Sequence, residues 1–170
     1  MFIAGNGGSS STASHFACDL AKWTLSEGKS RFRVMALTDN MPLFSALMND
    51  EGTASVYAEQ IEPFIGAGDV LILNFVHGGS GTGNAGSWSQ NLLRALQVAK
   101  DKGARVLGLS GFDGGALREM ADVCITVPVD STPQVGPSFW LLNTSCATTS
   151  GRKSPTLKGR ICHGTVHRQC

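Results

Sequence analysis

From Phe2 to Pro128, short apolar runs alternate with longer segments in which apolar residues recur at helical spacing. This alternation predicts strands and helices in turn, as in a parallel sheet covered by helices. The apolar runs are nearly continuous, which is typical of strands buried on both faces. Strands are expected at residues 2–4, 33–37, 70–76, 104–109 and 123–127, and helices at residues 10–27, 54–65, 89–102 and 116–121. The pattern predicts an α/β fold, a doubly wound three-layer sandwich around a five-stranded parallel sheet.

The pattern ends after Pro128. Gly136 and Pro137 are expected to interrupt any helix that begins there. The residues that follow are rich in Thr, Ser, Gly and Arg and show neither the helical nor the strand period of apolar residues. All 13 acidic residues lie at or before Asp130, whereas residues 136–170 hold five basic residues and no acidic one. We therefore expect a globular domain over residues 1–135 and an atypical basic tail over residues 136–170, largely disordered. The abrupt change suggests a shifted reading frame or an unrelated ending, and a divergent native tail is the alternative.

The composition of the chain limits which binding partners and which cellular compartment are expected. A chain of 170 residues with 42% hydrophobic residues is long enough for one domain with a real core. A formal net charge of +1 offers no general attraction for nucleic acid or an anionic membrane, so neither is an expected partner. No run of eighteen apolar residues and no basic leader is present, which predicts a cytoplasmic protein without a membrane span. Five irregularly spaced cysteines indicate reduced thiols.

A glycine-rich turn follows the first expected strand and opens the first expected helix. It supplies the candidate ligands Asn6, Gly7, Gly8 and Ser9. Helix amides at the carboxyl end of a strand can bind an anion, and glycine lets a ligand approach the backbone. The turn is neither a Walker loop, because no Lys-Ser/Thr pair follows, nor a G-x-G-x-x-G motif. The alternative is a purely structural strand-to-helix turn.

A second glycine-rich stretch, residues 77–89, lies between the third strand and its helix. It supplies the candidates Ser80, Ser87 and Ser89. Two such turns at one sheet edge can surround a single phosphate. The alternative is a flexible surface loop, and Ser87 or Ser89 then only caps the helix.

Further candidates for chemistry follow the first two strands. His15 and Asp19 are four residues apart on the first helix, so their side chains share one face. They suit an acid and base or two metal ligands, and an exposed ion pair is the alternative. Asp39 follows the second strand at the same sheet edge, where a carboxylate can bind sugar hydroxyls or cap a turn.

The tail holds one further pattern. Cys162, His163, His167 and Cys170 form a C-H-x3-H-x2-C cluster. It lacks a first C-x2-C half, so we interpret it as a chance cluster rather than a zinc site. A zinc-bearing nucleic-acid protein using the basic tail remains an alternative, although disorder explains the charge equally well.

Over residues 1–134 the motifs, taken in order, resemble the sugar isomerase (SIS) domain family, and within it the phosphoheptose isomerases. The resemblance lies in Gly5-Asn6-Gly7-Gly8-Ser9, His15-Phe16-Ala17 with an acid at 19, Leu37-Thr38-Asp39, Asn49-Asp50, Ser89-Gln90-Asn91-Leu92-Leu93, Gly108-Leu109-Ser110-Gly111, Asp113-Gly114-Gly115, Ala121-Asp122-Val123, Val127-Pro128 and Thr132-Pro133-Gln134. The resemblance implies a flavodoxin-like sandwich that forms a homotetramer, with active sites at subunit contacts.

The resemblance also implies a reaction. Members of the family convert sedoheptulose 7-phosphate into a heptose 7-phosphate by moving a proton between C1 and C2 through an enediol. The implied phosphate ligands are the serines Ser9, Ser80, Ser87 and Ser89, with Asn6, Gly7, Gly8, Asp39 and Gln134 as further substrate contacts. Asp19 matches the base, and His15 with Asp19 matches the Zn²⁺ ligands of some members. No nucleotide cofactor is expected.

This chain departs from the family pattern in four places. It begins at the first strand, without the usual preceding helical segment, and Asp19 replaces the commoner glutamate. A longer stretch replaces the serine-rich phosphate loop. Gly136, Pro137 and Thr144 stand where the family has a closing Gln-Glu motif and a histidine. The alternative to an isomerase is therefore a non-catalytic module that binds a phosphosugar as a sensor or assembly adaptor.

Overall fold

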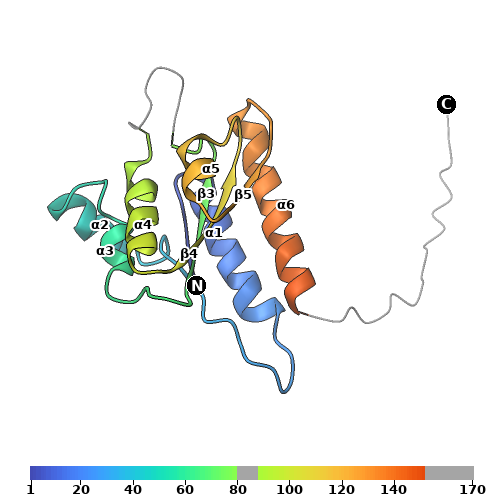
Figure 1. Cartoon of the computed structure of the whole chain (residues 1–170). Helices are drawn as coiled ribbons and strands as arrows, with labels where there is room; N and C mark the ends of the chain where they lie inside the picture. Colours follow the sequence, from blue (N-terminus) through green and yellow to red (C-terminus); the bar gives the residue numbers. More distant parts are fainter. Residues whose placement is uncertain (80–87, 152–170) are drawn as a thin grey trace, which may run out of the picture.

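The computed structural model describes residues 1–79 and 88–151 (Figure 1). Its five strands form one parallel sheet with helices on both faces. The expected doubly wound sandwich is thereby confirmed, and the strand order β2-β1-β3-β4-β5 is the flavodoxin-like one. The strands are β1 (Phe2–Gly5), β2 (Met35–Ala36), β3 (Val70–Phe75), β4 (Arg105–Ser110) and β5 (Val123–Thr126).

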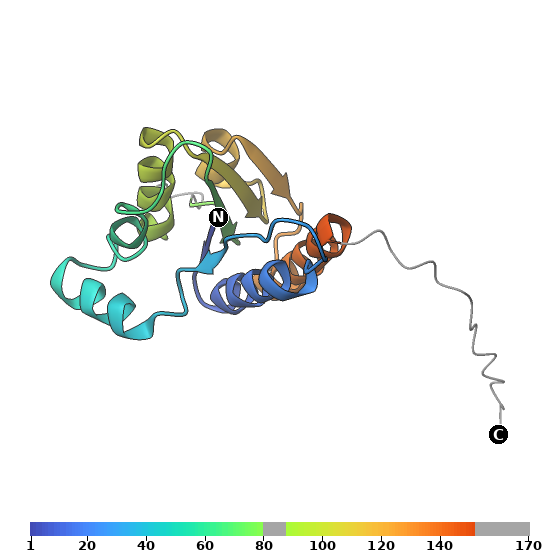
Figure 2. The ribbon, with the colours of Figure 1, turned by 90° about the horizontal axis from the view of Figure 1, so that it is seen from below.

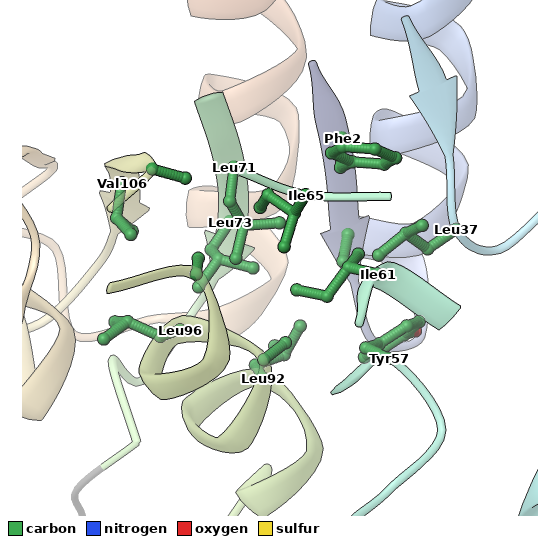
Figure 3. Close-up of a cluster of buried hydrophobic side chains, with 14 of the residues drawn as sticks. Phe2, Leu37, Tyr57, Ile61, Ile65, Leu71, Leu73, Leu92, Leu96 and Val106 are labelled. Carbon is green, nitrogen blue, oxygen red and sulfur yellow. The ribbon is translucent and has the colours of Figure 1, made fainter. Parts of the chain in front are cut away.

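Alternate residues of β3 face two separate cores. Leu71 and Leu73 pack in the core beneath α3 (Ala58–Ile61), α4 (Gln90–Asp101) and α5 (Gly115–Met120). Figure 3 shows side chains of this core. Ile72 packs in the core beneath α1 (Gly8–Cys18) and α6 (Thr132–Gly151). These two helices lie side by side on the opposite face of the sheet (Figure 2). The period of two in β3 therefore assigns each side chain to one layer.

The first helix and its surroundings differ from the expected ranges. α1 begins at Gly8 and continues after Cys18 into a π-helical turn, η1 (Asp19–Trp23). An additional helix, α2 (Met41–Asp50), begins where Asn40 accepts a hydrogen bond from the Leu43 amide at 3.2 Å. The sequence pattern did not predict α2, whose contact with the core is limited to the partly buried side chains of Phe44 and Leu47. The helix expected at residues 54–65 is reduced to the short α3.

β5 corrects the expectation that every strand is covered on both faces. It pairs only with β4 and lies at the edge of the sheet. Val123 is 56% exposed and Ile125 38% exposed. An apolar run of five residues does not distinguish an edge strand from a central one, because both kinds of strand form backbone hydrogen bonds with at least one neighbouring strand.

α6 corrects the expected boundary at residue 136. The disorder predicted from Gly136 onward is wrong for residues 136–151, because α6 runs from Thr132 to Gly151 with Pro137 inside it. Val135, Phe139 and Ala147 are fully buried on the sheet side of α6. Their spacing of four and eight residues forms a core-facing stripe, whose burial offsets the hydrogen bond that Pro137 removes. The remaining tail, with the Cys162 to Cys170 cluster, lies outside the described residues.

Within residues 1–79 and 88–151, no helix is both long and apolar enough to cross a bilayer.

Tyr57 couples the α3 side of the core to β1. Its hydroxyl donates to the Gly5 carbonyl at 2.7 Å, and the side chain is only 1% exposed. Burial raises the pKa of Tyr57 from 10.0 to about 12, because the phenolate loses its hydration inside the core.

This shift predicts a loss of stability at high pH. The folded-state pKa lies above the unfolded value, so the contribution of Tyr57 is fully present below pH 10 and is lost as the pH rises through about 12. The free energy of unfolding should fall by up to roughly 3 kcal/mol over this window relative to Tyr57→Phe. Denaturant titrations of both proteins across the window measure the difference. Parallel pH profiles would contradict the prediction.

Candidate functional site

A cavity of about 320 Å³ lies at the carboxyl ends of β1 and β3. These strands are neighbours in the sheet, and the chain order reverses between them. Ligands in open α/β sheets bind at this switch point, outside the carboxyl ends of the strands. The lining consists of Asn6, Gly7, Gly8 and Ser9 after β1, Asn74, Phe75, Val76 and His77 around the end of β3, Ser89 and Leu92 at α4, and Thr132 and Gly136 of α6.

The turn between β1 and α1 is fixed from both sides. A Cβ atom added to Gly5 would lie 2.6 Å from the Ser9 carbonyl oxygen, so only glycine fits there. The side-chain amides of Asn6 and Asn91 exchange two hydrogen bonds of 2.9 Å each. The Gly8 amide opens α1 and has no acceptor within the helix. This rigid turn directs the positive end of α1 toward the cavity, which favours an anionic group.

Asn74 was not among the sequence candidates. Its side chain is fully buried, and its Oδ1 accepts a hydrogen bond from Asn143 Nδ2 at 3.3 Å. Its Nδ2 has no hydrogen-bond partner in the described part of the chain. A single amide within the apolar run 70–76 was the available signal, since a buried polar side chain in a strand requires partners.

His77 also lines the cavity, although the sequence marked it only as the start of a glycine-rich turn. Its Nε2 lies 3.3 Å from Thr132 Oγ1, which connects the end of β3 to α6. Its ring packs against Trp88 and Phe112, with centroid distances of 5.0 and 4.5 Å. These contacts hold the imidazole in one place at the cavity wall.

His15 and Asp19 form the expected pair on α1. His15 Nδ1 lies 3.3 Å from Asp19 Oδ2, and the ring of Trp140 packs edge-on against His15 at 5.5 Å. Thr144 Oγ1 donates to the same Asp19 oxygen at 3.2 Å, across the contact between α1 and α6. Thr144 thus contacts the acid from the position where the resemblance implies a histidine.

The pair and the cavity are separate along α1. Neither His15 nor Asp19 lines the cavity. A helical rise of 1.5 Å per residue puts His15 roughly 9 Å and Asp19 roughly 15 Å from Ser9 along the axis. The structure therefore has two candidate subsites on one helix, rather than the single crevice that the motifs suggested.

Of the other sequence candidates, some line this cavity, some lie away from it, and two fall outside the described residues. Asp39 lies beside a different cavity of about 600 Å³ and accepts a hydrogen bond from Ser14. It follows β2, which lies on the opposite side of β1 from β3, so the strand order keeps it away from the first cavity. Gln134 is exposed in the first turn of α6 and does not line the cavity. Ser80 and Ser87 lie outside the described residues, whereas Asn6, Gly7, Gly8, Ser9 and Ser89 come together.

The donor set does not fit a resident zinc ion. His15 and Asp19 supply two ligands, and the next side chain on Asp19 is the neutral hydroxyl of Thr144. In the described ranges, no group of three or more His, Cys, Asp or Glu side chains is placed to hold a metal. Protein zinc sites use three or four such ligands.

The variant Thr144→His tests whether the His15–Asp19 pair lacks a further zinc ligand. The variant adds an imidazole beside Asp19 and should raise zinc affinity at this site by roughly tenfold or more. Competition of each protein with a chromophoric chelator measures the affinity. His15→Ala is the control, because zinc bound at this pair must depend on His15. Tight wild-type binding that His15→Ala abolishes would contradict the prediction.

Comparisons with known proteins agree with the fold. No protein-family model matches the chain. The lincomycin biosynthesis protein LmbN of Streptomyces lincolnensis is 49% identical over 133 residues, 78% of this chain and 47% of LmbN. A phosphoheptose isomerase of Helicobacter pylori is 39% identical over 135 residues, 79% of this chain and 65% of that protein. The chain thus spans about half to two thirds of the length of these curated relatives.

The fold of the chain is also similar to that of a solved structure. The phosphoheptose isomerase GmhA from Neisseria gonorrhoeae superposes with a TM-score of 0.75 at 28% sequence identity, covering 88% of this chain and 74% of that one. The parallel sheet with its two helical layers defines the class of α/β sandwich domains that bind at a strand switch point. The chain belongs to the sugar isomerase (SIS) domain family that includes the phosphoheptose isomerases.

Proposed function

We propose that the chain is a phosphosugar aldose-ketose isomerase that converts sedoheptulose 7-phosphate into a heptose 7-phosphate. The observation that carries the proposal is the arrangement along α1, with an anion-favouring cavity at its N-terminus and the His15–Asp19 pair further along it. Along the axis of α1, Ser9 lies roughly 9 Å from His15 and roughly 15 Å from Asp19, so the proposal requires the sugar phosphate to bind in an extended conformation along this helix. The name of the H. pylori relative, phosphoheptose isomerase, supports an isomerase that acts on a phosphosugar.

The mechanism uses the two functional groups of the pair. Thr144 and His15 both contact Asp19 Oδ2, which leaves Oδ1 to accept a proton from C1 of the ketose. His15 donates a proton to the carbonyl oxygen on C2 as the enediol forms. Asp19 then returns its proton to C2, and His15 takes the proton from the oxygen on C1. Both side chains end in their starting protonation states.

The α6 side of the pair favours a second candidate, a non-catalytic phosphosugar-binding module. Thr144 places a hydroxyl on Asp19, where an ionisable partner is expected from the resemblance. Gly136 lines the cavity without offering a side chain. Such a module keeps the anion cavity and uses binding alone, as a sensor or an assembly adaptor.

Nuclear magnetic resonance in D₂O separates the two functions. An isomerase converts sedoheptulose 7-phosphate and places solvent deuterium on C2 of the product, because the proton passes through an exchangeable carboxyl group. Perturbed ligand signals without conversion support the binding module. A ligand that neither binds nor reacts contradicts both proposals.

We also propose that the active form is a homotetramer. The support on this chain is the exposed apolar surface of α2, on which Met41, Leu43 and Met48 are all exposed. Exposed apolar patches of this kind are typical of subunit contacts. Sedimentation equilibrium gives the mass of the particle directly, and a monomer at all concentrations contradicts the assembly.

A further inference from the structure

The strongest unassigned feature of the cavity is the side chain of Asn74. It is fully buried, and its Oδ1 is fixed by Asn143 on α6. An amide group holds its oxygen and nitrogen in divergent directions, so this contact leaves Nδ2 directed away from Asn143. Nδ2 has no partner among the described residues, and Asn74 lines the cavity. A buried donor without a protein partner is unfavourable unless the oxygen of a ligand or an ordered water accepts from it.

His77 lies two residues beyond β3 on the same cavity wall. Among the described lining residues it alone has an ionisable side chain, and none is a lysine or arginine. Trp88 and Phe112 fix the ring, and the Thr132 hydroxyl lies at its Nε2. An imidazole held in this way can donate a hydrogen bond to an anion without first being ordered.

We propose that Asn74 and His77 are the side-chain ligands of a phosphoryl group in this cavity, with Asn74 Nδ2 donating to one of its oxygens. The inference rests on the proposed function for the presence of a phosphate on the ligand. The N-terminal amides of α1 supply the backbone donors of the same cradle. In this chain, the end of β3 therefore contributes an amide and an imidazole to this cradle.

Titration with inorganic phosphate, followed by calorimetry, tests the inference without requiring isomerisation. Asn74→Asp retains an oxygen for Asn143 and replaces the donor with a second oxygen, so the affinity should fall by roughly tenfold or more. His77→Phe retains the aromatic contacts and removes the donor, and the affinity should fall by roughly three- to tenfold. Asn49→Asp, the same chemical change at an exposed residue of α2, is the matched control and should alter the affinity less than about twofold.

Each outcome decides the inference. Loss of phosphate affinity in Asn74→Asp and His77→Phe, with the control unchanged, supports it. Wild-type affinity in a folded Asn74→Asp protein overturns it, as does a wild-type protein that does not bind phosphate. If the buried carboxylate prevents folding, the uncharged Asn74→Leu is measured with the same expectation. Phosphate binding that depends on Asn74, without turnover of sedoheptulose 7-phosphate, upholds this inference while the isomerase proposal fails.

Discussion

Asp19→Asn is expected to lower kcat for sedoheptulose 7-phosphate by at least about a hundredfold while leaving the affinity for inorganic phosphate within about twofold. Asparagine has the same shape and keeps an oxygen for the Thr144 hydroxyl, but it cannot accept a proton from carbon. The cavity that we propose to bind phosphate lies roughly 15 Å away along α1, beyond the reach of this change. Coupled product assays and phosphate titration of the same preparation measure the two quantities.

Asp19→Glu is the matched variant for this experiment. It keeps a carboxylate at this position, and it introduces the glutamate that the resemblance implies, which is longer by one methylene. We expect it to retain measurable turnover, which distinguishes loss of the base from loss of packing between α1 and α6. Turnover that survives in Asp19→Asn would remove Asp19 from the role of base and leave only a structural contact with Thr144 and His15.

The candidate site was predictable where function depends on backbone conformation. The turn from Asn6 to Ser9 is legible because glycines and serines directly follow an apolar strand, and the structure brings it together with Ser89. Asp39 was grouped with them because it also follows a strand. The order of strands in the sheet decides which carboxyl ends are neighbours, and this order depends on contacts distant in sequence.

The residues that sequence reasoning missed are recognised by their surroundings. Asn74 is noticeable only once its amide is seen to be buried and half satisfied. His77 becomes a cavity residue because Thr132 and Phe112 approach it from segments more than thirty residues away. No local pattern contains these contacts.

The fold was predictable where burial is periodic. The runs around β1, β3 and β4 are apolar on both faces, and these strands lie inside the sheet. α2 was missed because only Phe44 and Leu47 pack against the core and both stay partly exposed, and α6 was missed because Gly136 and Pro137 obscured its beginning. In α6, the burial of a few apolar side chains outweighs unfavourable local propensity, which a rule based on proline alone does not weigh.

Phe139→Ala tests whether α6 belongs to the cooperative core. Phe139 is fully buried between α6 and the sheet, alongside Val135 and Ala147. Removing the ring loses its transfer free energy and leaves a cavity, so the free energy of unfolding should fall by roughly 3–5 kcal/mol. Urea denaturation followed by circular dichroism measures the change.

Leu141→Ala supplies the control on the same helix, because Leu141 is 60% exposed and its truncation should cost less than about 0.5 kcal/mol. A large loss at Phe139 with little change at Leu141 means that residues 136–151 fold as part of the sandwich. Equal, small losses at both positions would mean that α6 is not docked on the sheet. In that case the Thr144 contact with Asp19 would lose its support, and the environment proposed for the base would fail with it.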